Sequence, residues 1–188
     1  NISRPHRLRG SILEIKNAKT YFDQLQDVGV TVDRNSRLSY INDLVLNHEK
    51  NKKVKPDLTS PLLNELTDLV ESPLLVTGRF DESFLDLPPE VLSTVMKVHQ
   101  RYIPLYKFNV EFDPLSLHSR NILLPNFLCI SNGLSSAKEN IILGNEKVLK
   151  ARFSDASFFI KSDLLINSSS RIQKLKEVTF AEGLGSLY

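Results

Sequence analysis

Hydrophobic positions along the chain follow helical spacing in some stretches and form short strand-like runs in others. Helical spacing predicts helices over residues 17–27, from 33 to about 50, and over 60–71, 88–102, 135–165 and 171–178. Short apolar runs predict strands over 11–15, 28–32, 73–77, 103–106 and 127–131. Because strands and helices mix without strict alternation, we expect an α+β fold in which a mixed sheet packs against helices and a helical segment ends the chain.

Local signals sharpen several of these boundaries. Asn17 and Asp33 are good N-caps, and proline at position 61 follows a cap oxygen at Ser60. The uninterrupted apolar run over 73–77 predicts a central strand buried on both faces. Gly144 is expected to break or kink the long helix over 135–165, and residues 107–122 are expected to form an extended loop.

Composition narrows the class of protein. The 188 residues are 41% hydrophobic and carry a net charge of +2, which is typical of a globular domain without a strongly basic surface. No apolar run approaches the roughly 20 residues of a membrane helix, so no membrane partner is expected. Two local basic clusters are interpreted either as a solvated loop or arm or as phosphate contacts: Arg4, His6, Arg7 and Arg9, and Lys50, Lys52, Lys53 and Lys55.

The sequence offers no familiar catalytic or metal-binding pattern. It lacks a glycine-rich phosphate loop, a nucleophile elbow and a zinc-protease helix. The single cysteine, Cys129, lies in an apolar run and is expected to be a buried, inert thiol. The four histidines are far apart in sequence, so we predict neither catalytic residues nor a metal site.

Polar residues stand in unexpected places on two predicted helices. On the helix over 90–102, His99 falls inside the arc of Val91, Val95, Val98 and Tyr102. The residue is either a core histidine or, with Gln100 and Arg101, part of a site that meets phosphate or ribose. On the helix over 144–160, Asn145 and Arg152 project from the middle of an apolar stripe that comprises Val148, Leu149, Phe153, Ala156, Phe159 and Ile160. A core-facing Arg152 requires a carboxylate partner, Asp155 or Asp163, or faces a ligand.

Both helices belong to a series of segments that resembles a known family. The series comprises PHRLR (5–9), ELTDLVESP (65–73), LLVTGRFDESF (74–84), LPPEVL (87–92), MKVHQRY (96–102), LPNF (124–127), GNEKVL (144–149), ARFSDA (151–156) and LGSLY (184–188). In order and spacing it resembles the beta subunit of the bacterial-type, heterotetrameric glycyl-tRNA synthetase. Ser72 departs from the tryptophan that is usual in that family, and residues 107–122 are longer than in typical members.

The resemblance implies an organisation that the residue pattern alone does not show. It implies an α+β core over residues 1–134, similar to the editing domain of the phenylalanyl-tRNA synthetase beta subunit. It also implies a helical segment over 135–188 that completes the domain and leads to an HD-type helical domain outside this chain. The chain is therefore expected to be an internal fragment of a cytoplasmic enzyme, or of a plastid one if the source is a plant-type relative.

The same resemblance implies a part in ATP-dependent glycylation of tRNA-Gly. ATP and magnesium would be used by the alpha subunit, leaving this fragment without a cofactor or an activity of its own. Expected partners are tRNA-Gly, the alpha subunit and a second beta subunit in an alpha2beta2 assembly. Candidate tRNA contacts are Lys97, His99, Gln100, Arg101, Asn145, Lys147 and Arg152. Two other roles stay open, a docking surface for the alpha subunit or another beta domain, and hydrolytic editing of misacylated tRNA.

Overall fold

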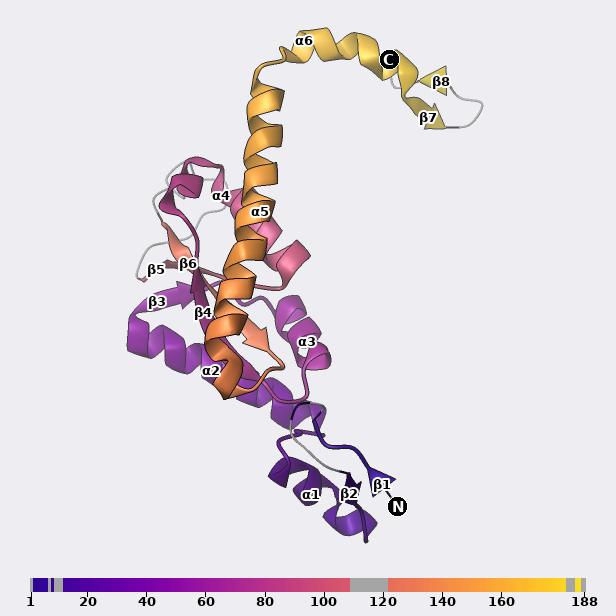
Figure 1. The fold of residues 1–188 in the computed structure, drawn as a ribbon. Helices are drawn as coiled ribbons and strands as arrows, with labels where there is room; N and C mark the ends of the chain where they lie inside the picture. The colour runs from indigo at the N-terminus through magenta and orange to yellow at the C-terminus, as the bar shows by residue number, and fades with distance from the viewer. Residues whose placement is uncertain (1, 7, 9–11, 109–121, 182–184, 187–188) are drawn as a thin grey trace.

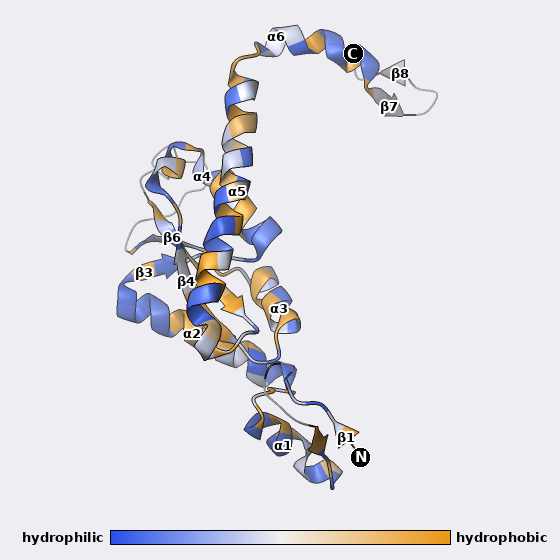
Figure 2. Cartoon of the chain, in the orientation of Figure 1, coloured by the Kyte–Doolittle hydropathy of each residue, from blue (hydrophilic) through white to orange (hydrophobic). Residues whose placement is uncertain are grey.

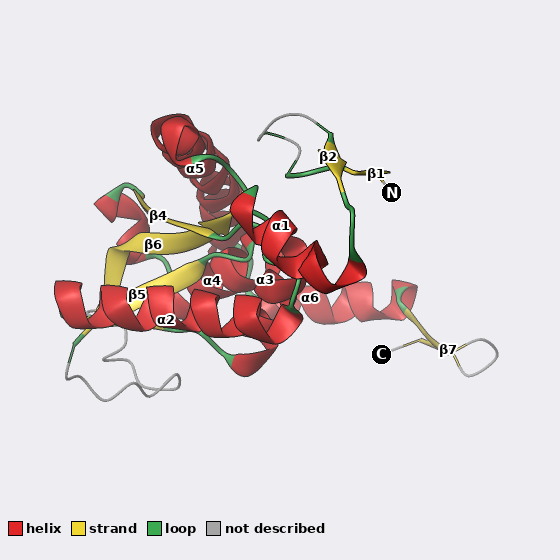
Figure 3. Cartoon of the chain, turned by 90° about the horizontal axis from the view of Figure 1, so that it is seen from below, coloured by secondary structure: helices red, strands yellow, loops and turns green. Residues whose placement is uncertain are grey.

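A four-stranded antiparallel sheet forms the centre of the molecule, with helices on both faces (Figures 1 and 3). The computed structural model describes residues 2–6, 8, 12–108, 122–181 and 185–186. The strand order is β3-β5-β6-β4, and each neighbouring pair runs antiparallel. The strands are β3 (Val54–Pro56), β4 (Leu74–Arg79), β5 (Ile103–Lys107) and β6 (Leu123–Ser131). The α+β class is confirmed, whereas the expectation of a mixed sheet was wrong.

Two helices, α2 (Arg34–Lys52) and α3 (Ser60–Leu69), cover one face of the sheet. Their apolar stripes meet the side chains that point from β5 and β6 toward the same face. The resulting core holds Ile41, Val45, Leu62, Leu66, Val70, Ile103, Leu105, Leu128 and Ile130, all nearly or fully buried. Period-3.6 stripes on helices and period-2 alternation on strands therefore converge on a single apolar layer.

The opposite face carries shorter helical segments and the long helix α5 (Lys138–Leu164), which follows the turn η5 (Ser135–Ala137). The shorter segments are η2 (Glu82–Asp86), α4 (Pro89–Thr94) and the π-helical segment η3 (Val95–His99). At the centre of this second core, the Phe153 ring of α5 meets Phe80 edge-on with ring centroids 5.0 Å apart. Phe127 of β6 stacks on Tyr102 at 4.6 Å. The contact between Phe80 and Phe153 fixes α5 against the sheet.

Segments far apart in sequence meet at Asn132, just after β6. The N-terminal segment forms the pair β1 (Ile2–Ser3) and β2 (Leu13–Glu14), then η1 (Ala18–Thr20) and α1 (Tyr21–Asp27). His6, fully buried, donates from Nε2 to the backbone oxygen of Asn132 at 2.9 Å, because its Nδ1 accepts from the Leu8 amide at 3.3 Å. The Asn132 side-chain oxygen accepts from the amides of Glu71 and Ser72 at 3.1 and 2.9 Å. Asn132 thus ties the N-terminal segment to the sheet.

Beyond the sheet, the chain ends in a bent extension of α5 (Figure 1). It comprises α6 (Ser168–Arg171), η6 (Ile172–Glu177) and the small pair β7 (Thr179–Ala181) and β8 (Gly185–Ser186). Figure 1 places this extension at the end of the molecule opposite the N-terminus. Within the described residues, no helix combines the length and apolar character needed to cross a membrane.

Most helix starts agree with the prediction because capping is local. Asn17 accepts from the Lys19 amide, and Asp33 accepts from the Ser36 amide at 2.6 Å. The cap of α3 is Thr59, one residue before the predicted Ser60. Cys129 is buried as expected.

Several predicted elements were wrong. Residues 28–32 form a turn and an irregular segment instead of a strand. Lys50 and Lys52 belong to α2 and Lys55 belongs to β3, with Lys53 in a left-handed turn between them, so the lysine-rich segment is not a loop or arm. Within the described residues, the strand β4 pairs only with β6 and is therefore an edge strand, not a central one. The helix α5 continues through Gly144 without interruption. Most of the predicted loop over 107–122 lies outside the described residues.

Candidate nucleic-acid interface

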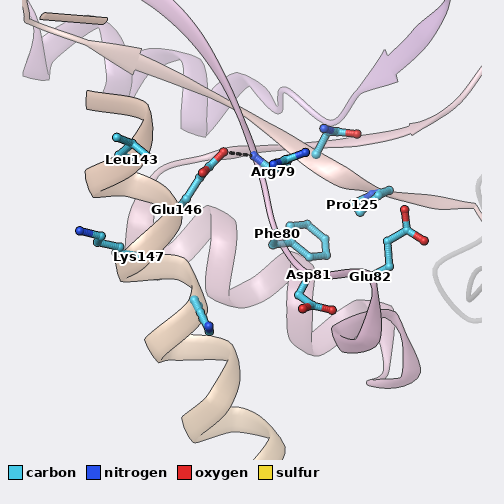
Figure 4. Close-up of a pocket in the computed structure, with 10 residues that line it drawn as sticks. Arg79, Phe80, Asp81, Glu82, Pro125, Leu143, Glu146 and Lys147 are labelled. Atoms are coloured by element: carbon cyan, nitrogen blue, oxygen red, sulfur yellow. Dashed lines mark hydrogen bonds between the residues drawn. The ribbon is translucent and has the colours of Figure 1, made fainter. Parts of the chain in front are cut away.

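A hollow of about 630 Å³ lies where α5 passes the end of β4 and the middle of β6 (Figure 4). Its walls come from three stretches that are distant in sequence: Arg79, Phe80, Asp81 and Glu82; Pro125 and Asn126; and Leu143, Glu146, Lys147 and Lys150. We call this hollow the α5–β4 groove. The burial of Phe80 beneath it and the packing of Phe153 hold α5 at a fixed distance from the strand.

Three cations line the groove. Arg79 continues the outward alternation of β4, and Lys147 and Lys150 are one helical turn apart on α5. All three are exposed. None of them forms an ion pair within the part of the chain that the structure describes. Their charges are therefore available to a ligand.

The carboxylates of the groove are partly engaged by the backbone. An oxygen of Glu146 accepts from the Arg79 amide at 2.9 Å (Figure 4). Asp81 accepts from the Ser83 amide at 2.9 Å and caps η2. Hydrogen bonds from Ser83, helped by the charge of Lys150, lower the pKa of Asp81. Both acids thus fix the shape of the groove, and Glu82 adds an exposed carboxylate at its edge.

The charged lining of the groove suits a ligand with both anionic and hydroxyl groups. Lysine and arginine neutralise phosphate, while carboxylate and amide oxygens accept hydrogen bonds from sugar hydroxyls. A ribose-phosphate backbone presents both groups on each nucleotide. Across the described residues, no cluster of His, Cys, Asp and Glu has a metal-binding arrangement.

Lys97 and Arg101, predicted as tRNA contacts, are instead engaged in ion pairs. Lys97 reaches Asp57 at 2.6 Å, and the guanidinium of Arg101 reaches Glu65 at 2.7 Å. Arg101 also adopts a left-handed backbone with φ of 55°, and it donates to the carbonyl oxygen of Val98 at 2.8 Å. These contacts close the C-terminus of η3 and connect it to α3 and to the segment after β3.

His99 and Gln100 lie at the same helix end. His99 is exposed, so its interpretation as a core histidine was wrong, and Gln100 is half-buried. The segment Val95–His99 is π-helical, and a hydrogen bond from the Tyr102 amide to the Met96 carbonyl at 2.9 Å closes its end. A wider turn rotates the residues after Met96 away from the expected stripe. Val98, predicted to be apolar core, is exposed as well, because the buried face of this helix follows Leu92 and Met96 instead of Val91 and Val95.

The candidates on α5 are divided between different faces. Lys147 lines the groove, whereas Asn145 lies against the sheet, where its Nδ2 atom is buried and has no hydrogen-bond partner among the described residues. The Asn145 amide approaches the Cys129 thiol without a well-formed hydrogen bond, and it partly offsets the effect of burial, which raises the pKa of Cys129 to about 11. Arg152 is exposed, so the prediction of a core-facing, paired arginine was wrong.

The helical wheel explains the error at Arg152. The predicted stripe included Val148 and Phe159, but both are exposed. The buried face instead follows Leu149 and Phe153, and it leaves Arg152 outside. Asp163, the suggested partner, pairs with Arg171 at 2.8 Å.

Sequence reasoning missed Arg79 and Lys150 as groove residues. The usable signal at Arg79 was strand alternation: Val76 and Gly78 are buried, while Thr77 and Arg79 are exposed. For Lys150 the signal was its spacing of three residues from Lys147. Neither signal indicates that the two elements lie side by side, because that contact depends on the tertiary fold.

The fold and the site together define an α+β module with a charged surface groove. The family model described as glycyl-tRNA synthetase beta subunit matches residues 1–188. The chain is 42% identical over 187 residues to the glycine–tRNA ligase beta subunit of Streptococcus agalactiae, covering 100% of this chain and 26% of the relative.

Relatives from other bacteria give the same result. The glycine–tRNA ligase beta subunit of Trichodesmium erythraeum is 42% identical over 183 residues, covering 97% of this chain and 25% of the relative. The glycine–tRNA ligase beta subunit of Bacillus subtilis is 40% identical over 184 residues, covering 97% of this chain and 25% of the relative. The chain belongs to the glycyl-tRNA synthetase beta-subunit family and spans about a quarter of the length of these relatives.

Proposed function

We propose that this chain is an RNA-contacting module of a glycine–tRNA ligase beta subunit and that it binds tRNA through the α5–β4 groove. The observation that carries the proposal is the set of three exposed cations, Arg79, Lys147 and Lys150, which form no ion pair within the described residues and stand on two packed elements. Within the module, ion pairs engage other cations, such as Lys97 and Arg101. Cations that stand on a rigid scaffold and form no ion pair favour contact with an external anion.

The acids of the groove narrow the ligand class. With Asp81, Glu82 and Glu146 beside three cations, the formal charge of the groove is balanced, so a bare polyanion gains little from long-range attraction. A ribose-phosphate chain gains more, because its hydroxyls donate to carboxylates while its phosphates meet the cations. We therefore propose contact with the sugar-phosphate backbone of tRNA, without reading of base sequence.

The predicted contacts have unequal support. Lys147 belongs to the groove, together with the newly found Arg79 and Lys150. His99 and Arg152 are exposed and open to a ligand at other positions, and Gln100 lies beside His99. Lys97 and Arg101 would have to break an ion pair, and Asn145 faces the sheet.

The wider assignment rests on family membership. We propose that the module serves an alpha2beta2 ligase that glycylates tRNA in the cytoplasm, with ATP and magnesium bound by the alpha subunit. In that assembly the module would bind and position tRNA and take no part in bond formation. Its partners would be tRNA-Gly, the alpha subunit and the second beta subunit.

Charge removal in the groove of the assembled enzyme tests the proposal. The double variant K147Q/K150Q should weaken tRNA binding and reduce the slope of log affinity against log salt by about 0.7–0.9 for each phosphate that is no longer neutralised. The KM for tRNA should rise while kcat changes little, because the module is proposed to act in binding.

A matched control removes two other exposed lysines. K16Q/K19Q makes the same change in net charge on the N-terminal segment, away from the groove. If K147Q/K150Q and K16Q/K19Q give equal tRNA affinities and equal salt slopes, the groove is not an RNA contact.

A further inference from the structure

The second half of α5 and the segments after it expose a continuous series of large apolar residues. We call this series the apolar arm: Phe158, Phe159, Leu164, Leu165, Ile166, Ile172, Leu175 and Val178. Leu164 is 81% exposed and Leu165 is 87% exposed. Single exposed apolar residues are common on any protein, but eight along one continuous stretch indicate an unfilled interface.

The arm projects because α5 is longer than the sheet that it covers. Its 27 residues make a helix about 40 Å long. Phe153 is the last fully buried residue of α5, and Ile160 is the last residue packed against the core. Figure 1 shows the rest of the helix rising past the sheet, and Figure 2 shows apolar residues recurring along this projecting part.

The bend at the end of α5 is held by specific contacts. The guanidinium of Arg171 donates to the carboxylate of Asp163 at 2.8 Å and to its backbone oxygen at 3.0 Å. Asn167 caps α6 by accepting from the Ser169 amide at 3.1 Å. The bend therefore presents Leu164, Leu165 and Ile166 in a defined geometry, as expected of a surface shaped for a partner.

We infer that the apolar arm packs against a segment of the same beta-subunit polypeptide that lies outside residues 1–188. The beta subunit from Streptococcus agalactiae is matched over only 26% of its length. About three quarters of such a polypeptide is thus available to cover the arm. A segment of the same chain has a high effective concentration, and its docking costs no translational freedom of a second molecule.

The chemistry of the arm favours protein over RNA as the occupant. Six of its eight residues are aliphatic, and aliphatic side chains cannot provide the stacking platform that unpaired bases require. The Arg171 guanidinium at the bend is engaged by Asp163. The arm accordingly offers a continuous apolar area, which is typical of the centre of a protein–protein contact.

Thiol labelling in the full-length beta subunit tests the inference. L165C places a cysteine on the arm, and L69C places one at the end of α3, on the other face of the sheet, where Leu69 is 59% exposed. If another segment of the subunit covers the arm, L165C should react at least about tenfold more slowly than L69C. Both should react equally fast in urea, and the parent protein supplies the background from native cysteines.

Each other outcome overturns the inference. Equal rates for L165C and L69C in the beta subunit alone would show that the arm is open. Protection that appears only when the alpha subunit is added, only at raised beta-subunit concentration, or only with tRNA would assign the arm to a different occupant. These results do not depend on the α5–β4 groove, so a failure here is distinguishable from a failure of the proposed function.

Discussion

Replacement of Gly78 by alanine tests the packing that positions the groove. Gly78 lies on β4 directly opposite Phe127 of β6. A Cβ atom at residue 78 would lie 2.4 Å from Cζ of Phe127 and 2.7 Å from Cε1. Ordinary contact distances begin near 3.4 Å, so the ring would have to move by roughly 1 Å.

The ring has no room to move. Phe127 is fully buried and stacks on Tyr102 with centroids 4.6 Å apart. Overpacking of this kind costs about 1–3 kcal/mol, and the lower entropy of the unfolded alanine chain returns only ~0.4–1 kcal/mol. We therefore expect Gly78→Ala to destabilise the protein by about 1–2 kcal/mol.

Gly144→Ala is the matched control, and it is expected to have the opposite effect on stability. Gly144 is inside α5, and a Cβ there meets nothing within 4 Å. Alanine is preferred over glycine in a helix by about 0.5–1 kcal/mol, so this variant should be more stable than the parent.

Urea unfolding followed by circular dichroism measures both changes, since the chain contains no tryptophan for a fluorescence signal. A midpoint for Gly78→Ala at or above that of Gly144→Ala would refute the packing described here. The double variant G78A/F127L provides a further check. Its destabilisation should be smaller than the sum of the two single effects, because a smaller side chain at residue 127 removes the clash.

Two further predictions concern single side chains. Asn132→Ala leaves the amides of Glu71 and Ser72 without their acceptor, and we expect the protein to be destabilised by about 2–4 kcal/mol in the same unfolding assay. Asn132→Asp keeps the acceptor and should be far less destabilising; equal effects would contradict the role of the side-chain oxygen. Burial raises the pKa of Cys129 to about 11, so its alkylation at pH 8 should be on the order of a hundredfold slower in the folded protein than in urea. Equal rates would show that the thiol is accessible.

The sequence predicts those parts of the fold that depend on near neighbours. The cap of α2 could be identified because Asp33 acts on the amide of Ser36, three residues away. The strands β5 and β6 could be identified because apolar runs bounded by polar residues suit a buried sheet. Each of these features depends on side chains within a few residues of one another.

What the sequence did not predict depends on distant partners. The apolar sequence of strand β4 predicts a central position in the sheet. The strand nevertheless lies at the sheet edge, where α5 packs beside it. The π turn of η3 has no signal in the residues before it. It is held by Arg101, whose left-handed backbone would by itself cost about 1–2 kcal/mol and whose side chain is fixed by Glu65, 36 residues away.

The candidate site shows the same division between local and distant information. From the sequence alone, every lysine and arginine is an equally good candidate for a phosphate contact. The fold separates them by their partners. Lys97 already has Asp57, so its contact with tRNA would require an ion pair to be exchanged for another. Lys147 and Lys150 form no such ion pair among the described residues, so a phosphate could approach them without an existing ion pair having to break. On this criterion Lys147 and Lys150 are better candidates for a phosphate contact than Lys97.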